Sequence, residues 1–100
     1  QSMNGPGISR TNYSIIATSI FSEQLAIGFS ISEISDVEID IYSINGRIVR
    51  SITPGILEPG QHSVVWDGTG DSGNSLGQGI YFVRVCTEQG IVTEKVNLIR

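Results

Sequence analysis

The segment from Asp67 to Asn74 contains the residue types that bind a hard cation, because aspartate, asparagine and serine oxygens alternate there with glycines. Its spacing differs from that of an EF-hand loop, since the sixth position is Ser72 rather than glycine and the twelfth is Gln78 rather than glutamate. Aspartate and asparagine side chains also cap their own turns. We therefore expect a turn-forming loop without a cofactor, and keep calcium binding by Asp67, Asp71 and Asn74 as the alternative.

Side chains of catalytic type are few, with His62 the only histidine and Cys86 the only cysteine. A catalytic triad needs a nucleophile and an orienting acid beside the histidine, and no nucleophile-elbow motif is present. A single thiol makes neither an internal disulfide nor a zinc site. Cys86 falls within a β pattern, so we expect a small residue of a sheet. We predict that the protein is not an enzyme.

Two aromatic residues allow a second kind of site. Exposed Trp66 and Tyr81 side chains would form a platform for stacking sugar rings, as in a carbohydrate-binding module. Trp66 is, however, in phase with Val64 on an alternating segment. We therefore expect the indole ring to fill the centre of the core.

Composition limits the partners of the chain. Its 100 residues are 39% hydrophobic and 16% charged, which suits one domain with one core. The net charge of −4 and only six Lys and Arg residues offer no basic surface for nucleic acid. Apolar runs of four residues or fewer are far shorter than the roughly 20 that span a bilayer. We expect no nucleic-acid partner and no membrane insertion.

Apolar and polar side chains alternate with a period of two along most of the chain, which predicts strands. Asn45-Gly46 predicts a tight hairpin, and Pro54-Gly55 places a loop over 53–60. Strands joined by short turns pair antiparallel. The sequence thus predicts an all-β fold, an immunoglobulin-like antiparallel β-sandwich of about seven strands. The predicted strands are 14–21, 24–31, 36–42, 47–52, 61–67, 80–87 and 91–99.

The beginning of the chain has a different character from the rest. Residues 1–3 have the composition of an expression-tag remnant, and we interpret 4–12 as a linker. The sandwich domain is expected over 13–100.

Residues 37–100 carry a motif pattern that resembles the C-terminal sorting domain of the type IX secretion system of Bacteroidetes-like bacteria. The same pattern is similar to the immunoglobulin-like domain of the flagellar hook-cap protein. The matching residues are Ile41-Tyr42, Gly46-Arg47, Gly60-Gln61-His62, Val64, Trp66-Asp67-Gly68, Gly73, Gly79-Ile80-Tyr81-Phe82, Lys95, Val96, Leu98 and Arg100.

This resemblance implies a non-catalytic C-terminal domain that targets a larger N-terminal cargo for secretion through the periplasm and attachment to the cell surface. The implied partners are an outer-membrane translocon and a surface sortase. The family signal lies in the last two strands. Carried over, it points to Gly79, Tyr81, Lys95, Val96, Leu98 and Arg100.

Three other interpretations of the sequence stay open. One is an immunoglobulin-like accessory or spacer module of an extracellular hydrolase, and another is the carbohydrate-binding module. The third concerns assembly, because an edge strand at the end of a chain also permits a strand-swapped dimer.

Overall fold

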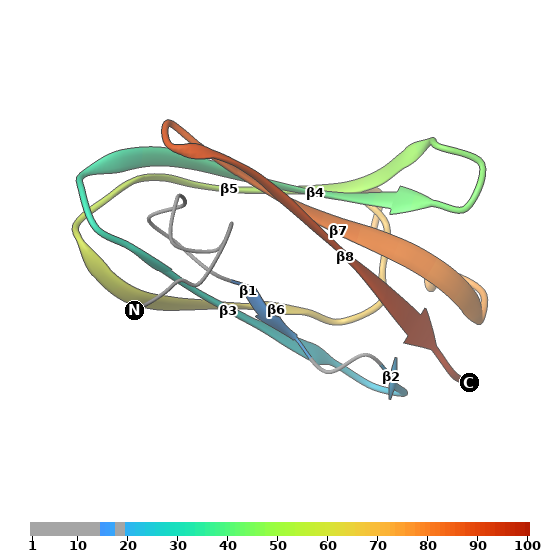
Figure 1. Ribbon diagram of the computed structural model, residues 1–100. Helices are drawn as coiled ribbons and strands as arrows, with labels where there is room; N and C mark the ends of the chain where they lie inside the picture. The colour runs from blue at the N-terminus through green and yellow to red at the C-terminus, as the bar shows by residue number, and fades with distance from the viewer. Residues whose placement is uncertain (1–14, 18–19) are drawn as a thin grey trace.

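The computed structural model describes residues 15–17 and 20–100, which form two packed β-sheets without a helix (Figure 1). A three-stranded sheet has the order β1-β3-β6, and a five-stranded sheet has the order β2-β8-β7-β4-β5. No described segment is a helix of the length and hydropathy needed to cross a membrane. The strands are β1 (Ile15–Ala17), β2 (Ile20–Phe21), β3 (Leu25–Ile31), β4 (Ser35–Ser43), β5 (Ile48–Leu57), β6 (Gly60–Trp66), β7 (Gly79–Thr87) and β8 (Gly90–Leu98).

The core lies between the two sheets and is made by the side chains that alternate inward. The alternation predicts this set, because every second residue of a strand faces the same side. Trp66 is fully buried at its centre, which confirms the core position expected for the indole ring. Within 20–100, the fourteen buried hydrophobic residues are Phe21, Leu25, Ile27, Phe29, Ile31, Val37, Ile39, Ile41, Trp66, Tyr81, Val83, Val85, Val96 and Leu98.

The β4–β5 hairpin forms where the Asn45-Gly46 dipeptide predicts it, with Ile44 and Asn45 as the central turn residues and Gly46 directly after them. Gly46 has a φ of +85°, a backbone conformation that costs glycine little and other residues more. The Gly46 N–H donates to the carbonyl of Ser43 at 2.9 Å, and the Ser43 N–H donates to the carbonyl of Arg47 at 2.8 Å. The hairpin therefore fixes the register between β4 and β5.

The prediction of a loop over 53–60 is wrong for residues 53–57, because β5 continues to Leu57. The register shifts between Val37 and Ile39 of β4, which places Thr53 and Pro54 opposite a single residue. A bulge of this kind accommodates an extra residue. Pro54 is tolerated because β5 is an edge strand of its sheet, where a missing N–H costs no ladder hydrogen bond.

The single first strand expected over 14–21 is also wrong, since the chain forms two short strands in different sheets. β1 pairs antiparallel with β3, whereas β2 pairs parallel with β8, contrary to the purely antiparallel pairing expected. The partners of β2 are Asn97 and Leu98 alone, so among the described residues no other strand is hydrogen-bonded to the outer edge of β8 over 90–96. The tag and linker expected over 1–12, and the domain start at residue 13, lie outside the described residues.

Candidate functional site

The loop over 67–78, between β6 and β7, follows directly after the buried Trp66 and contains the motif residues Asp67, Gly68 and Gly73. Phe21 and Tyr81 pack against the Trp66 ring with centroid distances of 5.3 Å and 5.5 Å. The indole Nε1–H donates to the carbonyl of Thr69 at 2.9 Å. The Tyr81 hydroxyl donates to the carbonyl of Gly77 at 2.7 Å. Trp66 and Tyr81 therefore hold the loop by their polar ends.

Asp67 begins the loop by capping its own turn. One carboxylate oxygen accepts hydrogen bonds from the Thr69 hydroxyl at 2.5 Å and from the Thr69 N–H at 3.2 Å. The hydrogen bond from the Thr69 side chain is the largest cause that lowers the pKa of the Asp67 carboxyl below its usual value. Hydrogen bonds that favour the charged form have this effect.

The middle of the loop is attached to the edge of β5. The Asp71 N–H donates to the carbonyl of Val49, and the Ser51 N–H donates to the Asp71 carboxylate, each at 3.0 Å. The Arg50 guanidinium donates to the Thr69 hydroxyl at 3.0 Å and to the carbonyl of Gly70 at 3.1 Å. These contacts cover one part of the β5 edge with the loop.

Arg100 attaches the end of the chain to the same loop. Its Nε–H donates to the carbonyl of Leu76 at 2.9 Å, and its Nη2–H donates to the carbonyl of Gly68 at 3.0 Å. The Arg100 N–H donates to the Gln78 side chain at 3.3 Å. Gly68 has a φ of +80°, and a Cβ there would lie 2.7 Å from Nη2 of Arg100. We call these contacts of Arg100 with Gly68, Leu76 and Gln78 the C-terminal latch.

The turn-capping interpretation of the acidic loop agrees with these contacts. Asp67 caps Thr69, the Asp71 carboxylate accepts from β5, and the Asn74 side-chain oxygen accepts from Ser72 at 2.5 Å. Within 15–17 and 20–100, no group of three His, Cys, Asp or Glu side chains is placed to hold a metal ion.

The six sorting-signal candidates divide between the interior and the surface. Tyr81, Val96 and Leu98 are buried in the core, so a receptor cannot contact them in the folded domain. Gly79 begins β7 with a φ of +148°. Arg100 forms the latch, and Lys95 is exposed on β8.

The carbohydrate-stacking hypothesis for Trp66 and Tyr81 is wrong. Their exposed fractions are 0% and 9%, so neither ring offers a face to a sugar. His62 is half-buried and its Nε2 lies 2.7 Å from the carbonyl of Glu58. Cys86 is half-buried within β7, as expected for a small sheet residue.

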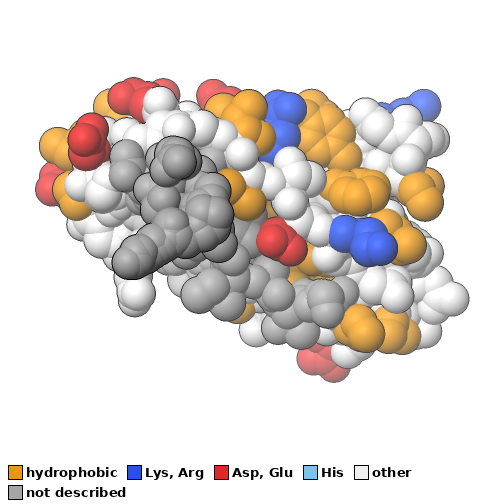
Figure 2. All heavy atoms as spheres, in the orientation of Figure 1, with side chains coloured by type: hydrophobic (Ala, Val, Ile, Leu, Met, Phe, Trp, Pro, Cys, Tyr) orange, Lys and Arg blue, Asp and Glu red, His pale blue; other side chains and the backbone are white. Residues whose placement is uncertain are grey.

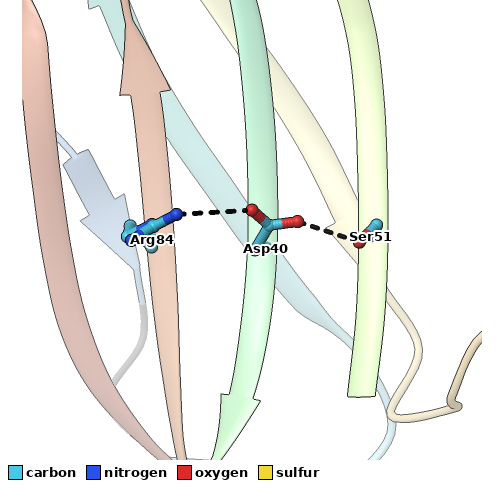
Figure 3. A network of polar contacts seen from close by, with 3 residues as sticks. All are labelled: Asp40, Ser51 and Arg84. Carbon is cyan, nitrogen blue, oxygen red and sulfur yellow. Dashed lines mark hydrogen bonds and ion pairs between the residues drawn. The ribbon is translucent and has the colours of Figure 1, made fainter. Parts of the chain in front are cut away.

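The sequence interpretation missed a set of side chains on the outer face of the five-stranded sheet. Asp40 of β4 lies there between Ser51 of β5 and Arg84 of β7 (Figure 3). The Ser51 hydroxyl donates to Asp40 at 2.8 Å, and the Arg84 guanidinium lies 3.8 Å from the other Asp40 oxygen. Arg84 also lies over the Tyr42 ring, 5.2 Å from its centroid. The signal was the alternation itself, which directs Tyr42 away from the core.

Two antiparallel-rich sheets packed face to face, with the first strand divided between them, define an immunoglobulin-like sandwich. The chain belongs to the FlgD Ig-like domain family, whose model matches residues 17–90. A search of curated proteins returned no significant sequence match.

Solved structures with the same fold come from proteins of different size. FlgD from P. aeruginosa matches with a TM-score of 0.65 and 23% identity, over 87% of this chain and 74% of that one. FlgD from Xanthomonas campestris, described for hook capping essential for flagellar assembly, matches with a TM-score of 0.60 and 18% identity, over 87% and 67%. Dimeric latent PorU from Porphyromonas gingivalis matches with a TM-score of 0.72 and 20% identity. That match covers 87% of this chain and only 9% of PorU.

Proposed function

We propose that this Ig-like module is a non-catalytic C-terminal sorting domain that directs a larger cargo protein through type IX secretion to the cell surface. One observation carries the proposal: several of the motif residues form one connected unit. Trp66, Asp67 and Gly68 open the 67–78 loop, Tyr81 contacts both the loop and the indole ring, and Arg100 joins the loop to the chain end. The part of the motif pattern that lies in the last third of the chain is thereby explained as a single folded structure.

The likeness to a small part of PorU supports a modular role. The matched region occupies 9% of that chain, so the same sandwich occurs there as one unit of a much longer protein. A domain that delivers cargo has this relation to its parent. The proposed partners are an outer-membrane translocon and a surface sortase, and the proposed location is the cell surface, reached through the periplasm.

The polar chemistry of the described residues supports a non-catalytic role. The Asp67 and Asp71 carboxylates cap the 67–78 loop and β5, and the Arg50 and Arg100 guanidinium groups donate to loop acceptors. These groups hold the backbone in place. A catalytic constellation instead needs a nucleophile and a base within hydrogen-bond reach.

A reporter fusion tests the proposed function. The whole chain is fused behind a reporter with a periplasmic signal peptide, in a host that has a type IX system. We expect the reporter on the cell surface, measured by protease accessibility in intact cells, and in the periplasm of a strain that lacks the translocon. A reporter that stays periplasmic in the complete host contradicts the proposal.

A hook-cap module is the second candidate, favoured by the family model and by the two FlgD structures. A hook-cap role predicts that the fused domain stays with the hook fraction of a flagellated host. It also predicts that deleting the type IX translocon leaves the location of the domain unchanged. A spacer role in a hydrolase predicts neither surface transfer nor hook association.

A further inference from the structure

The outer face of the five-stranded sheet presents a row of apolar side chains that ends in a cation. Ile48 of β5 pairs with Tyr42 of β4, Tyr42 pairs with Phe82 of β7, and Phe82 pairs with Lys95 of β8. Neighbouring strands lie about 4.8 Å apart, so the four side chains extend over about 14 Å. We call these four residues the outer-face row.

Arg84 adjoins this row with unused capacity for hydrogen bonds. Its guanidinium lies over the Tyr42 ring, and its contact with Asp40, at 3.8 Å, is longer than a hydrogen bond. Its Nε is buried and has no hydrogen-bond partner. The side chain is still 38% exposed. Arg84 is thus held in place, and the exposed part of its side chain, rather than the buried Nε, is available to an acceptor that arrives from solvent.

Charge is unevenly distributed along the sandwich. Lys95 and Arg84 lie at or beside the outer-face row, and Arg47 lies in the adjoining β4–β5 hairpin. Figure 2 shows orange and blue side chains together around the C-terminal half of β8 and the β4–β5 hairpin, and most of the red ones toward the opposite end. Acidic residues in or beside the β3–β4 and β7–β8 turns at that end are Glu33, Asp36 and Glu88.

This combination fits a protein partner of defined chemistry. Tyrosine, phenylalanine and arginine are enriched where protein interfaces bury their centres. Cations on one half of a face favour a partner of opposite charge, because complementary potentials speed association and reject other partners. The matching surface therefore has an apolar centre and carboxylates around it.

We propose that the outer-face row, together with Arg84, is where a protein of the export machinery binds this domain, through an acidic surface with an apolar centre. This inference rests on the proposed function. Lys95 links the proposed sorting function to the outer-face row, because it is the sorting-signal candidate that is both exposed and part of the row. The buried candidates Tyr81, Val96 and Leu98 then act by supporting the sheet beneath it.

The surface-reporter assay with variants of the row tests this inference. Lys95→Glu and Phe82→Ser are each expected to lower the amount of reporter at the cell surface by about tenfold, the effect of losing one contact of about 1.4 kcal/mol. Lys95→Arg keeps the charge and is expected to retain export. Val65→Ser removes an apolar side chain that is 53% exposed on the other sheet, and serves as the matched control. Urea unfolding followed by Trp66 fluorescence confirms that each variant folds.

The outcomes separate the two proposals. Loss of surface reporter with Lys95→Glu, and retention with Lys95→Arg and Val65→Ser, supports the outer-face row. Surface reporter that is unchanged by both row variants overturns the row while leaving the proposed function intact. A wild-type reporter that remains periplasmic overturns the proposed function itself. If Phe82→Ser does not fold, Lys95→Glu still decides, because Lys95 is exposed.

Light scattering of the purified chain tests a different occupant. A dimer that Phe82→Ser converts to monomer assigns the row to a second copy of this chain, and overturns the proposal of an export partner. A monomeric wild-type chain is the expected result.

Discussion

Gly68 and Arg100 lie in direct contact, so that a side chain at position 68 would require the Arg100 guanidinium to move. The Arg100 Nη2–H donates to the carbonyl of Gly68 at 3.0 Å. A Cβ on Gly68 would approach the same nitrogen to 2.7 Å. Thirty-two residues separate the pair in sequence, so the contact joins the start of the 67–78 loop to the end of β8.

Gly68→Ala is expected to destabilise the domain more than Gly73→Ala. Both glycines have a positive φ, +80° and +88°, so each substitution has a backbone cost of about 1–2 kcal/mol. Nothing lies within 4 Å of a Cβ on Gly73, whereas a Cβ on Gly68 displaces Arg100. Urea unfolding measures the difference, and equal losses for the two variants would contradict the latch.

Arg100→Met is expected to loosen the 67–78 loop with little effect on the core. The substitution keeps an apolar stem but removes the donors to Leu76 and Gly68, one contact exposed and the other part-buried, at a cost of about 1 kcal/mol. The Leu76 N–H, which donates to the carbonyl of Gly68 at 3.0 Å, should exchange faster with solvent deuterium. Arg47→Met, in the exposed hairpin turn, is the control and should leave that exchange rate unchanged.

Trp66→Phe is expected to lower the free energy of unfolding by about 2–3 kcal/mol. The smaller ring leaves a cavity in the core, and the Thr69 carbonyl loses its donor. Thermal unfolding followed by circular dichroism measures the loss without the indole signal. Val65→Ala, at a neighbouring residue that is 53% exposed, should change stability by about 0.5 kcal/mol or less.

The stability difference between the wild type and Asp67→Asn is expected to depend on pH. The folded-state pKa of Asp67 is lowered, so its contribution is fully present above the usual value of 3.8 and is lost as pH falls through the folded pKa. Urea unfolding at a series of pH values measures the difference. Thr69→Val removes the side-chain hydrogen bond that is the largest cause of the lowered Asp67 pKa. In a Thr69→Val background, the stability difference caused by Asp67→Asn should therefore change less with pH. A difference that stays constant down to low pH would contradict this role of the Thr69 hydroxyl.

Ser35→Ala is expected to cost about 1–3 kcal/mol, because it leaves a part-buried N–H without its partner. The Ser35 hydroxyl is buried and accepts from the Glu88 N–H at 2.9 Å, which joins the start of β4 to the β7–β8 turn. Ser63→Ala is the control, because Ser63 of β6 is exposed. Equal stability of the two variants would show that the Ser35 contact contributes nothing measurable.

Most of the fold follows from residues that alternate with a period of two. Val37, Ile39 and Ile41 illustrate this, because all three are fully buried while Glu38 remains exposed. Alternation depends only on residues that are neighbours in the chain, so it can be recognised from the sequence alone. It does not show that Pro54 lies in an edge strand, since that depends on the neighbours of β5 in the folded sheet.

The candidate site was less predictable than the strands, because most of its contacts join residues that are far apart in the sequence. Asp67 was placed in a turn by its own local chemistry. The partnership of Gly68 with Arg100 brings together residues that are distant in the chain, which no spacing rule reveals. Alternation alone predicts that Tyr42 and Phe82 each point away from the core. It does not predict that they lie side by side, because that depends on the register between β4 and β7.

The two edges of the five-stranded sheet differ in whether a strand from another copy of the chain could pair with them. The β5 edge contains Pro54 and two register shifts, and the 67–78 loop occupies part of it, so a further strand cannot continue the ladder there. Backbone pairing between copies through this sheet can then proceed only along β8. An association with a single usable edge closes after two copies, so the strand-swapped pair left open by the sequence could not extend into a fibre by way of this sheet.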